Sequence, residues 1–325
     1  MQNYSKTQKF LHDLVFNNKI INKSLFEIEK IFYLSKKKLD IENETHIFIT
    51  GLPRSGTTIL LNFIYSTNEF ASLTYGNMPF LLSPNFSKFF NKNGIKKIER
   101  MHKDGIYYDS NSPDTFDEVF FNNEEQFVKK ELLNYIKLIL TSRNRFKYLS
   151  KNNLNYSRID LIRSIFPNAI FIIPIREPLQ HAYSLLTQHL NFIRLQKKND
   201  FIRRYMNYLG HNEFGLNHRP WNNFINFKDF NNINYWLEQW FIFYKFVLDN
   251  FKSQKNIHFV VYEELKNIDY VKKILKNINL KNIENIKFDY FKTTNEKKII
   301  DGYNLVTYNK TKLIYKEFLK QTLKD

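Results

Sequence analysis

Short apolar runs of strand length alternate along this chain with longer segments whose apolar residues recur at helical spacing. Four runs read as strands, at residues 46–50, 70–75, 169–175 and 257–262. The third is apolar throughout, which is typical of an inner parallel strand covered on both faces. Helical spacing extends over residues 7–43, 124–148, 178–197, 233–252, 268–278 and 310–323. Because strands and helices alternate, we predict an α/β fold: a doubly wound, P-loop-like parallel sheet flanked by helices, with a helical N-terminal segment.

Two stretches lack this periodicity. Residues 83–123 are polar and irregular, and a structureless stretch of that length is usually functional, here as a frame for an acceptor site. Residues 208–221 combine two Gly with His, Glu and Arg, which fits a lid or the rim of a cleft, although a surface loop is the preferred interpretation. We expect a single domain in three parts: a helical N-terminal segment 1–44, an α/β core 45–265 and a helical C-terminal segment 266–325.

The first predicted strand leads into a loop with the spacing of a P-loop, Gly51-x4-Gly56-Thr57-Thr58, and then into an apolar helix. A helix start leaves backbone N–H groups unpaired and carries a positive dipole, so such a loop forms a cradle for an anion. A nucleoside triphosphatase needs Lys where this chain has Thr57. Arg54 and the hydroxyl groups supply other donors. The alternative, a plain turn before a buried helix, is disfavoured because the donors cluster between an apolar strand and an apolar helix.

At this motif the chain resembles the sulfotransferases that use 3′-phosphoadenosine 5′-phosphosulfate (PAPS), in particular their bacterial and tyrosylprotein-type branches. In that family a strand, loop and helix of the form Gly-x-x-Arg-Ser-Gly-Thr-Thr hold the 5′-phosphosulfate. The resemblance implies that PAPS is the cosubstrate, and that the residues which bind it here are Arg54, Ser55, Gly56, Thr57 and Thr58.

A second match lies where the strand 169–175 ends in Arg176. Pro178 suits the first position of the following helix, which carries Ser184 eight positions after Arg176. In the family that the chain resembles, an Arg at a strand end and a Ser eight residues later bind the 3′-phosphate, which implies the same roles for Arg176 and Ser184. Two helical turns place the hydroxyl above the strand end. The alternative is that Arg176 caps a helix and that Ser184 has no role in binding. The P-loop motif earlier in the chain disfavours this alternative.

Two further residues follow from the resemblance. Tyrosylprotein-type sulfotransferases carry a Lys at a strand end before a short polar turn, and Lys151 resembles it, which implies that it neutralises charge on the transferring group. One solvated Lys in a Lys-rich chain is an equal alternative. Tyr262 resembles a family position near the nucleotide and would otherwise be a packed strand aromatic. Between these two positions, a Ser-x-x-Asp pattern at Ser157 and Asp160 predicts a capped short helix.

A general base is needed for a hydroxyl acceptor, and its assignment is open. Tyrosylprotein-type enzymes use a Glu after the P-loop helix, where this chain offers Asn77, which cannot take a proton. His102 is a candidate because imidazole titrates near neutrality, and its position resembles that of a His in cytosolic sulfotransferases. Glu118 is a second candidate in a semi-apolar setting. The alternative for both His102 and Glu118 is a solvated loop residue without a catalytic role. The remaining histidines singled out lack metal-ligand spacing and are interpreted as structural or exposed: His181, His189, His211 and His218.

Composition adds few constraints. Lys and Arg number 49 against 32 Asp and Glu, a formal net charge of +17 that suits a polyanionic nucleotide, an acidic acceptor or nucleic acid. Cys is absent, so disulfides and thiolate metal sites are excluded. The start lacks the apolar core of a signal peptide and no apolar run approaches about 20 residues, so we expect a cytoplasmic protein without a membrane span. The strand 169–175 ends in Arg rather than in an Asp that would hold Mg²⁺, and no metal is expected.

The sequence therefore predicts a sulfotransferase that moves the sulfuryl group of PAPS to a hydroxyl or amine of an acceptor. Carbohydrate, a small alcohol or amine, and a peptide all remain open as acceptors. One alternative is a P-loop kinase for a small metabolite, which Thr57 and the missing Mg²⁺ ligand disfavour. Another is a non-enzymatic, basic polyanion-binding protein. Such a protein would concentrate its Lys on one stripe, whereas Lys is spread along this chain, so nucleic acid is not expected as a partner.

Overall fold

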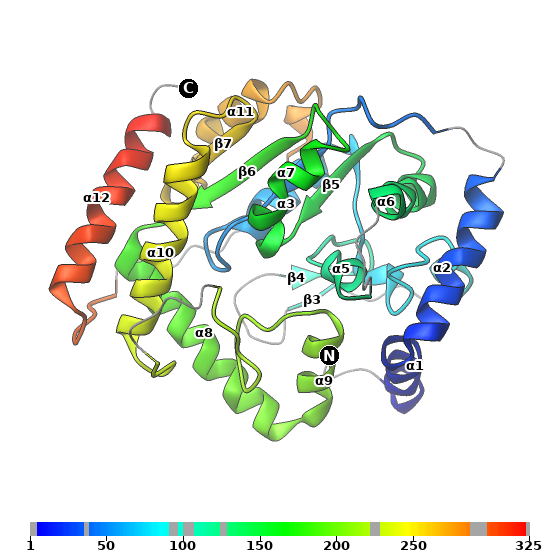
Figure 1. Ribbon diagram of the computed structural model, residues 1–325, viewed down its shortest axis with the longest axis horizontal. Coiled ribbons are helices and arrows are strands. Elements are labelled where there is room, and N and C mark those ends of the chain that lie inside the picture. The colour runs from blue at the N-terminus through cyan, green and yellow to red at the C-terminus, as the bar shows by residue number, and fades with distance from the viewer. Residues whose placement is uncertain are drawn as a thin grey trace.

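The centre of the computed structural model is a five-stranded parallel sheet (Figure 1). The structure describes residues 5–35, 39–90, 97–99, 107–123, 129–221, 228–286 and 298–322. From one edge of the sheet to the other, the strands are β2 (Phe70–Ala71), β5 (Lys147–Lys151), β1 (Ile47–Ile49), β6 (Ile170–Ile175) and β7 (Ile257–Val261). Each neighbouring pair runs parallel. The predicted parallel α/β architecture is confirmed.

The strand order reverses at β1. From β1 the chain passes through α3 (Thr57–Ser66) to β2 and later β5 on one side, and then crosses to β6 and β7 on the other. In open parallel sheets, ligands bind outside the carboxyl ends of the strands where the order reverses. The loop after β1, the end of β5 and the start of α8 (Pro178–Lys198) therefore meet at one edge of the sheet.

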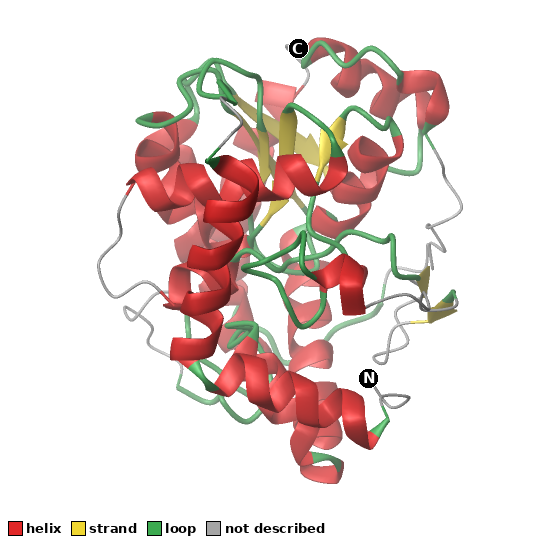
Figure 2. Cartoon of the chain, turned by 90° about the vertical axis from the view of Figure 1, so that its right-hand side faces the viewer, coloured by secondary structure: helices red, strands yellow, loops and turns green. Residues whose placement is uncertain are grey.

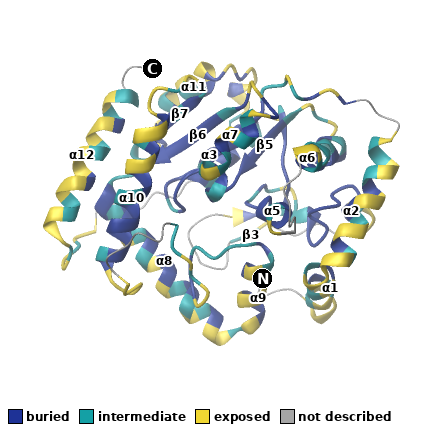
Figure 3. Cartoon of the chain, in the orientation of Figure 1, coloured by how far each residue is buried: buried dark blue, intermediate teal, exposed yellow. Residues whose placement is uncertain are grey.

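Helices cover both faces of the sheet, and successive strand residues point to opposite faces. One face packs against α3 and α11 (Ile268–Asn277) through Ile47, Ile49, Leu149, Ile172 and Val260. The other packs against α6 (Lys129–Arg143), α10 (Ile233–Phe251) and α12 (Leu305–Thr322) through Phe48, Tyr148, Phe171, Ile173 and Phe259. Figure 2 shows the strands between the helices, and Figure 3 shows them buried. Each such side chain contributes about 1.5–3 kcal/mol when fully buried, which explains the apolar inner strands.

The aromatic stripe of α10 lies in the core, and it also fixes the end of β6. Trp236, Trp240 and Tyr244 have no exposed surface. The Tyr244 hydroxyl donates to the Pro174 carbonyl at 2.8 Å, and the Trp240 indole N–H donates to the Arg176 carbonyl at 3.3 Å. These two bonds hold the backbone on either side of the point where the strand ends.

The N-terminal segment consists of α1 (Lys6–Asn17) and α2 (Lys19–Leu34), which are separated at Asn18. The Asn18 side chain accepts from the Ile21 N–H at 3.1 Å and so caps the second helix. Phe26 of α2 packs against α6, with its ring centroid 6.5 Å from that of Tyr135. The prediction of helix across residues 7–43 is wrong at the break and after Leu34, because an Asn side chain competes with the helix backbone at the break.

The prediction of helix over 124–148 is wrong at its end. Asn144 adopts a left-handed conformation, with φ of 52°, and the Arg145 N–H returns to the Leu140 carbonyl at 3.1 Å. This closes α6, and β5 begins at Lys147. The predicted capping box is also wrong, because the Ser157 hydroxyl donates to the Leu154 carbonyl within a 3₁₀ turn.

The segment 83–123 contains short elements where the sequence predicted none. They are α4 (Ser87–Phe90), β3 (Ile98–Glu99) paired antiparallel with β4 (Tyr107–Tyr108), and α5 (Glu118–Asn123). The remaining elements are α7 (Ile159–Arg163), α9 (Asp200–Tyr208) and 3₁₀ turns at Tyr75–Asn77, Asn153–Arg158, Tyr262–Glu264 and Ile283–Asn285. Within the described ranges, no helix combines the length and apolar character needed to cross a bilayer.

Candidate active site

The loop after β1 forms a tight cradle at the start of α3. Gly51, Arg54 and Gly56 have φ values of 140°, 67° and 102°, so three residues of this short loop adopt a backbone conformation that favours glycine. A Cβ atom on Gly56 would lie 2.9 Å from side-chain atoms of Tyr262 and Leu265, so only glycine fits there. The first N–H groups of α3 have no partner inside the helix and carry its positive dipole. The loop is therefore built to receive an anion.

Ser55 holds the shape of this loop. Its side chain is fully buried, and its hydroxyl donates to the Leu52 carbonyl at 2.6 Å. Of the predicted hydroxyl donors, those of Thr57 and Thr58 belong to residues that line the neighbouring cavity. The part of Ser55 that remains for a ligand is its backbone N–H.

The residues predicted to bind the two ends of the nucleotide lie together. Arg54 Nε donates to Ser184 Oγ at 3.3 Å, and Arg176 Nη1 donates to the Arg54 carbonyl at 2.9 Å. The Arg176 guanidinium lies over the Tyr262 ring, 4.3 Å from its centroid. Burial lowers the pKa of Arg176, and the charge of Arg54 acts in the same direction. Two guanidinium groups at close range in a half-buried setting favour an anionic ligand.

A buried histidine ties the loop to α8. His181 Nε2 lies 2.8 Å from the Pro53 carbonyl, and because a carbonyl only accepts, Nε2 carries the proton. Burial lowers the pKa of His181 to about 3, and the charge of Arg176 lowers it further, so the ring is neutral. His181 is a structural residue, as predicted.

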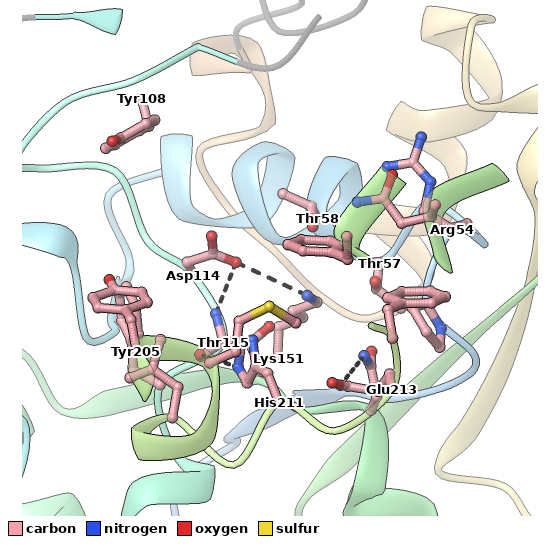
Figure 4. A pocket seen from close by; sticks show the side chains of 18 of the residues that line it. Arg54, Thr57, Thr58, Tyr108, Asp114, Thr115, Lys151, Tyr205, His211 and Glu213 are labelled. Carbon is pink, nitrogen blue, oxygen red and sulfur yellow. Dashed lines mark hydrogen bonds and ion pairs between the residues drawn. The ribbon is translucent and has the colours of Figure 1, made fainter. Parts of the chain in front are cut away.

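A cavity of about 160 Å³ opens beside the loop (Figure 4). Its lining joins distant parts of the chain: the P-loop, Tyr75, Tyr108, the segment 114–116, the end of β5 with Asn153, and the helices α8 and α9 with the loop that follows α9. The polar and charged side chains of this lining are Arg54, Thr57, Thr58, Asp114, Thr115, Lys151, Asn153, Gln188, His211 and Glu213.

Lys151 lies at the centre of this polar group. It is the last residue of β5, and in the sheet it pairs with Ile49, directly before the P-loop. Lys151 Nζ lies 3.9 Å from Asp114 Oδ1, and both side chains are largely buried. The Asp114 carboxylate also accepts from the Tyr75 hydroxyl at 2.5 Å and from the Thr115 N–H at 2.8 Å. Figure 4 shows the Lys151 ammonium between Asp114 and the P-loop threonines, whereas the Arg54 guanidinium points away from it.

Of the two predicted bases, Glu118 does not line this cavity. Glu118 is buried, and its two carboxylate oxygens accept from Arg158 at 2.7 and 2.8 Å. The Asn152 amide donates to the same carboxylate at 2.8 Å. Because Glu118 does not line the cavity, its buried pair with Arg158 fits a structural role better than that of a proton acceptor. His102 lies outside the described residues.

The sequence reasoning missed several of the residues that line the cavity. The segment 208–221 is more than a surface loop, since His211 and Glu213 line the cavity. His211 Nε2 lies 3.0 Å from the Thr115 carbonyl, and the Asn153 amide donates to Glu213 at 3.0 Å. The two glycines of the segment 208–221 could have indicated this role from the sequence, and both adopt a positive φ in the structure. No feature of the sequence indicated that Asp114 would line the cavity.

The chain is similar to known proteins along most of its length. A profile described as the sulfotransferase family matches residues 46–281. The structure of sulfotransferase STF9 from Mycobacterium avium is similar, with 12% identity, a TM-score of 0.52 and coverage of 94% of this chain and 83% of that one. Sulfotransferase STF1 from Mycobacterium tuberculosis H37Rv has 12% identity and a TM-score of 0.47, with coverage of 93% and 83%. No match was found among curated protein sequences.

Proposed function

The chain belongs to the sulfotransferase family, and from this we propose that it moves the sulfuryl group of PAPS to an acceptor hydroxyl. The observation that carries the proposal is the meeting of Arg54, Arg176 and Ser184 beside a P-loop without a lysine. A nucleotide with two separate anionic ends needs two groups of donors, one at each end. An amine acceptor is compatible with the same donor site.

In this proposal the donor lies along the carboxyl edge of the sheet. The backbone N–H groups from Ser55 to Thr58, with the hydroxyls of Thr57 and Thr58, hold the 5′-phosphosulfate. Arg176 and Ser184 hold the 3′-phosphate. The Arg54 side chain, which contacts Ser184, belongs with this second group. Tyr262 packs against Gly56 and beneath Arg176, and so supports both ends.

The transfer forms one bond and breaks another. The acceptor oxygen attacks sulfur, while the bond from sulfur to the bridging oxygen breaks and its electron pair stays on the 5′-phosphate. By analogy with phosphoryl transfer, the transition state is loose, so placement and charge stabilisation dominate. Lys151 donates to the bridging oxygen as negative charge develops there.

The acceptor proton needs a base beside this centre. Asp114 is the carboxylate that contacts Lys151, and we assign the proton to it. The ion pair with Lys151 and the two donors to Asp114 fix the direction of the carboxylate. His102 stays a prediction for this role.

Calorimetry with adenosine 3′,5′-bisphosphate in the absence of Mg²⁺ tests the proposal. Binding with 1:1 stoichiometry is expected, because the charges that hold the nucleotide come from side chains. Stronger binding of Mg-ATP would support a kinase instead. Binding only to polyanionic polymers, with steep salt dependence, would support a polyanion-binding protein.

A further inference from the structure

One group of the residues that line the cavity forms an apolar wall. It is formed by Phe116, Phe192, Tyr205, Met206, Leu209 and Phe214. Each of these side chains is buried, and the rings of Phe192 and Phe214 lie parallel with centroids 6.1 Å apart. Figure 4 shows Tyr205 and Tyr108 across the cavity from Arg54. A packed wall of this kind is pre-formed, and it favours an apolar body.

The polar end of the cavity restricts the charge of the acceptor. Among the described residues, the charged side chains that line the cavity are the carboxylates of Asp114 and Glu213 and the cations of Lys151 and Arg54. Bound PAPS would add further negative charge to that end. Because like charges at short range repel strongly in a partly buried site, an anionic acceptor is disfavoured.

The size of the cavity restricts the acceptor further. Its volume is about 160 Å³, and an apolar cavity of about 150 Å³ accommodates benzene. The volume of the cavity therefore corresponds to a body of one ring. A sugar of the same size would place several hydroxyls against the apolar wall, where they lose hydrogen bonds to water without replacement.

We propose that the acceptor is a small apolar molecule of one-ring size, uncharged or cationic, with one hydroxyl directed at Asp114. The proposal rests on the proposed sulfotransferase function and narrows its acceptor. The apolar body lies on the wall around Leu209, and the hydroxyl lies between Lys151 and Asp114. A carbohydrate, which the sequence left open, does not fit this lining.

Three probes of similar size test this with PAPS as donor. They are para-cresol, para-hydroxybenzoate, which adds one negative charge, and glucose, which replaces the apolar body with hydroxyls. Release of adenosine 3′,5′-bisphosphate gives kcat/KM for each. We expect para-cresol to exceed each of the other two by at least about 100-fold, since buried charges and hydroxyls are left unpaired. Glucose or para-hydroxybenzoate turned over as well as para-cresol would overturn the proposal.

Substitutions at two positions test which residues contact the acceptor. Leu209→Gln puts an amide into the apolar wall and should lower kcat/KM for para-cresol about 10- to 100-fold, while Leu209→Met should stay near wild type. Glu213→Gln should raise the activity on para-hydroxybenzoate relative to para-cresol about 10-fold, because it removes one repelling charge. Unchanged thermal unfolding and nucleotide binding show that each variant is folded. If Leu209→Gln leaves para-cresol turnover intact, the wall does not contact the acceptor.

Failure of this proposal and failure of the proposed function are distinguishable. If adenosine 3′,5′-bisphosphate binds but para-cresol is neither transferred nor bound, the acceptor proposal is wrong and the donor site stands. If the nucleotide does not bind, the proposed function is wrong. In that case saturation-transfer NMR of para-cresol, with Leu209→Gln as control, still decides whether the cavity takes an apolar ring.

Discussion

Arg54 Nε donates to Ser184 Oγ at 3.3 Å across 130 positions of sequence. Each residue belongs to a separate motif, one after β1 and the other in α8, and each motif alone has an ordinary structural explanation. Because the two motifs contact each other, a shared ligand explains both better than two unrelated structural roles. Because Arg176 also donates to the Arg54 carbonyl, the position of the P-loop backbone depends on the second motif.

Arg176→Ala should weaken binding of adenosine 3′,5′-bisphosphate about 10- to 100-fold, because charge-assisted hydrogen bonds to a phosphate are lost. Ser184→Ala should weaken it less, by about 5-fold, since one neutral donor is removed. Calorimetry at fixed salt measures both. Arg203→Ala is the matched control, since Arg203 lies on α9 and pairs only loosely with Asp200 at 3.9 Å among the described residues. Wild-type affinity in both site variants would show that the 3′-phosphate binds elsewhere.

Lys151→Ala should reduce kcat about 100- to 1,000-fold with little change in nucleotide affinity, because the lysine acts on charge that develops during transfer. Lys147→Ala, at the other end of the same strand, is the control. Lys147 lies 3.6 Å from Glu69 and is more exposed. Steady-state kinetics with calorimetry separates the two effects. A similar loss in both variants would indicate damage to β5 rather than lost chemistry.

Asp114→Asn should lower kcat about 100- to 10,000-fold, the usual range for loss of a general base. Nucleotide binding should not weaken, since a negative charge near the sulfuryl group is removed. Calorimetry and steady-state kinetics measure the two effects. If Glu213→Gln lowers kcat by this amount and Asp114→Asn leaves kcat near wild type, the base is Glu213.

Glu118→Gln should affect stability and spare catalysis. The change removes the charge that pairs with Arg158, and breaking a buried pair costs about 3 kcal/mol. Urea unfolding measures the loss, and kcat of the folded fraction should stay near wild type. Glu317→Gln, which breaks an exposed pair with Lys320 on α12, should leave stability unchanged. A large fall in kcat without a change in stability would return Glu118 to the list of bases.

Local motifs could be predicted from the sequence, and the assembly of the cavity could not. Arg176 and Ser184 belong to one strand and helix, so their spacing alone brings them to one end of the sheet. Asp114 and Glu213 reach the cavity on irregular segments whose paths depend on tertiary packing, and neither stands out among the many loop carboxylates. Asn144 ended a helix that its apolar pattern would have continued, because the left-handed conformation is cheap for Asn.

The dependence of stability on pH between 4.5 and 7 tests the packing between α2 and the segment after β2. The Glu29 carboxylate is buried, and burial raises its pKa from about 4.5 to about 7. It accepts from the Asn85 N–H at 3.0 Å, the Asn85 amide at 2.7 Å and the Phe86 N–H at 3.0 Å. These three donors favour the ionised form and oppose the effect of burial.

If burial dominates, the folded protein keeps the Glu29 proton between pH 4.5 and 7 while the unfolded chain releases it. Stability then falls as pH rises through that window, by about 3 kcal/mol in total, and is flat above it. Glu29→Gln removes this titration but keeps the buried histidines. The free energy of unfolding of the wild type minus that of the variant should therefore fall from pH 4.5 to 7. A difference that rises with pH would mean that the three donors outweigh burial and that the carboxylate is ionised throughout.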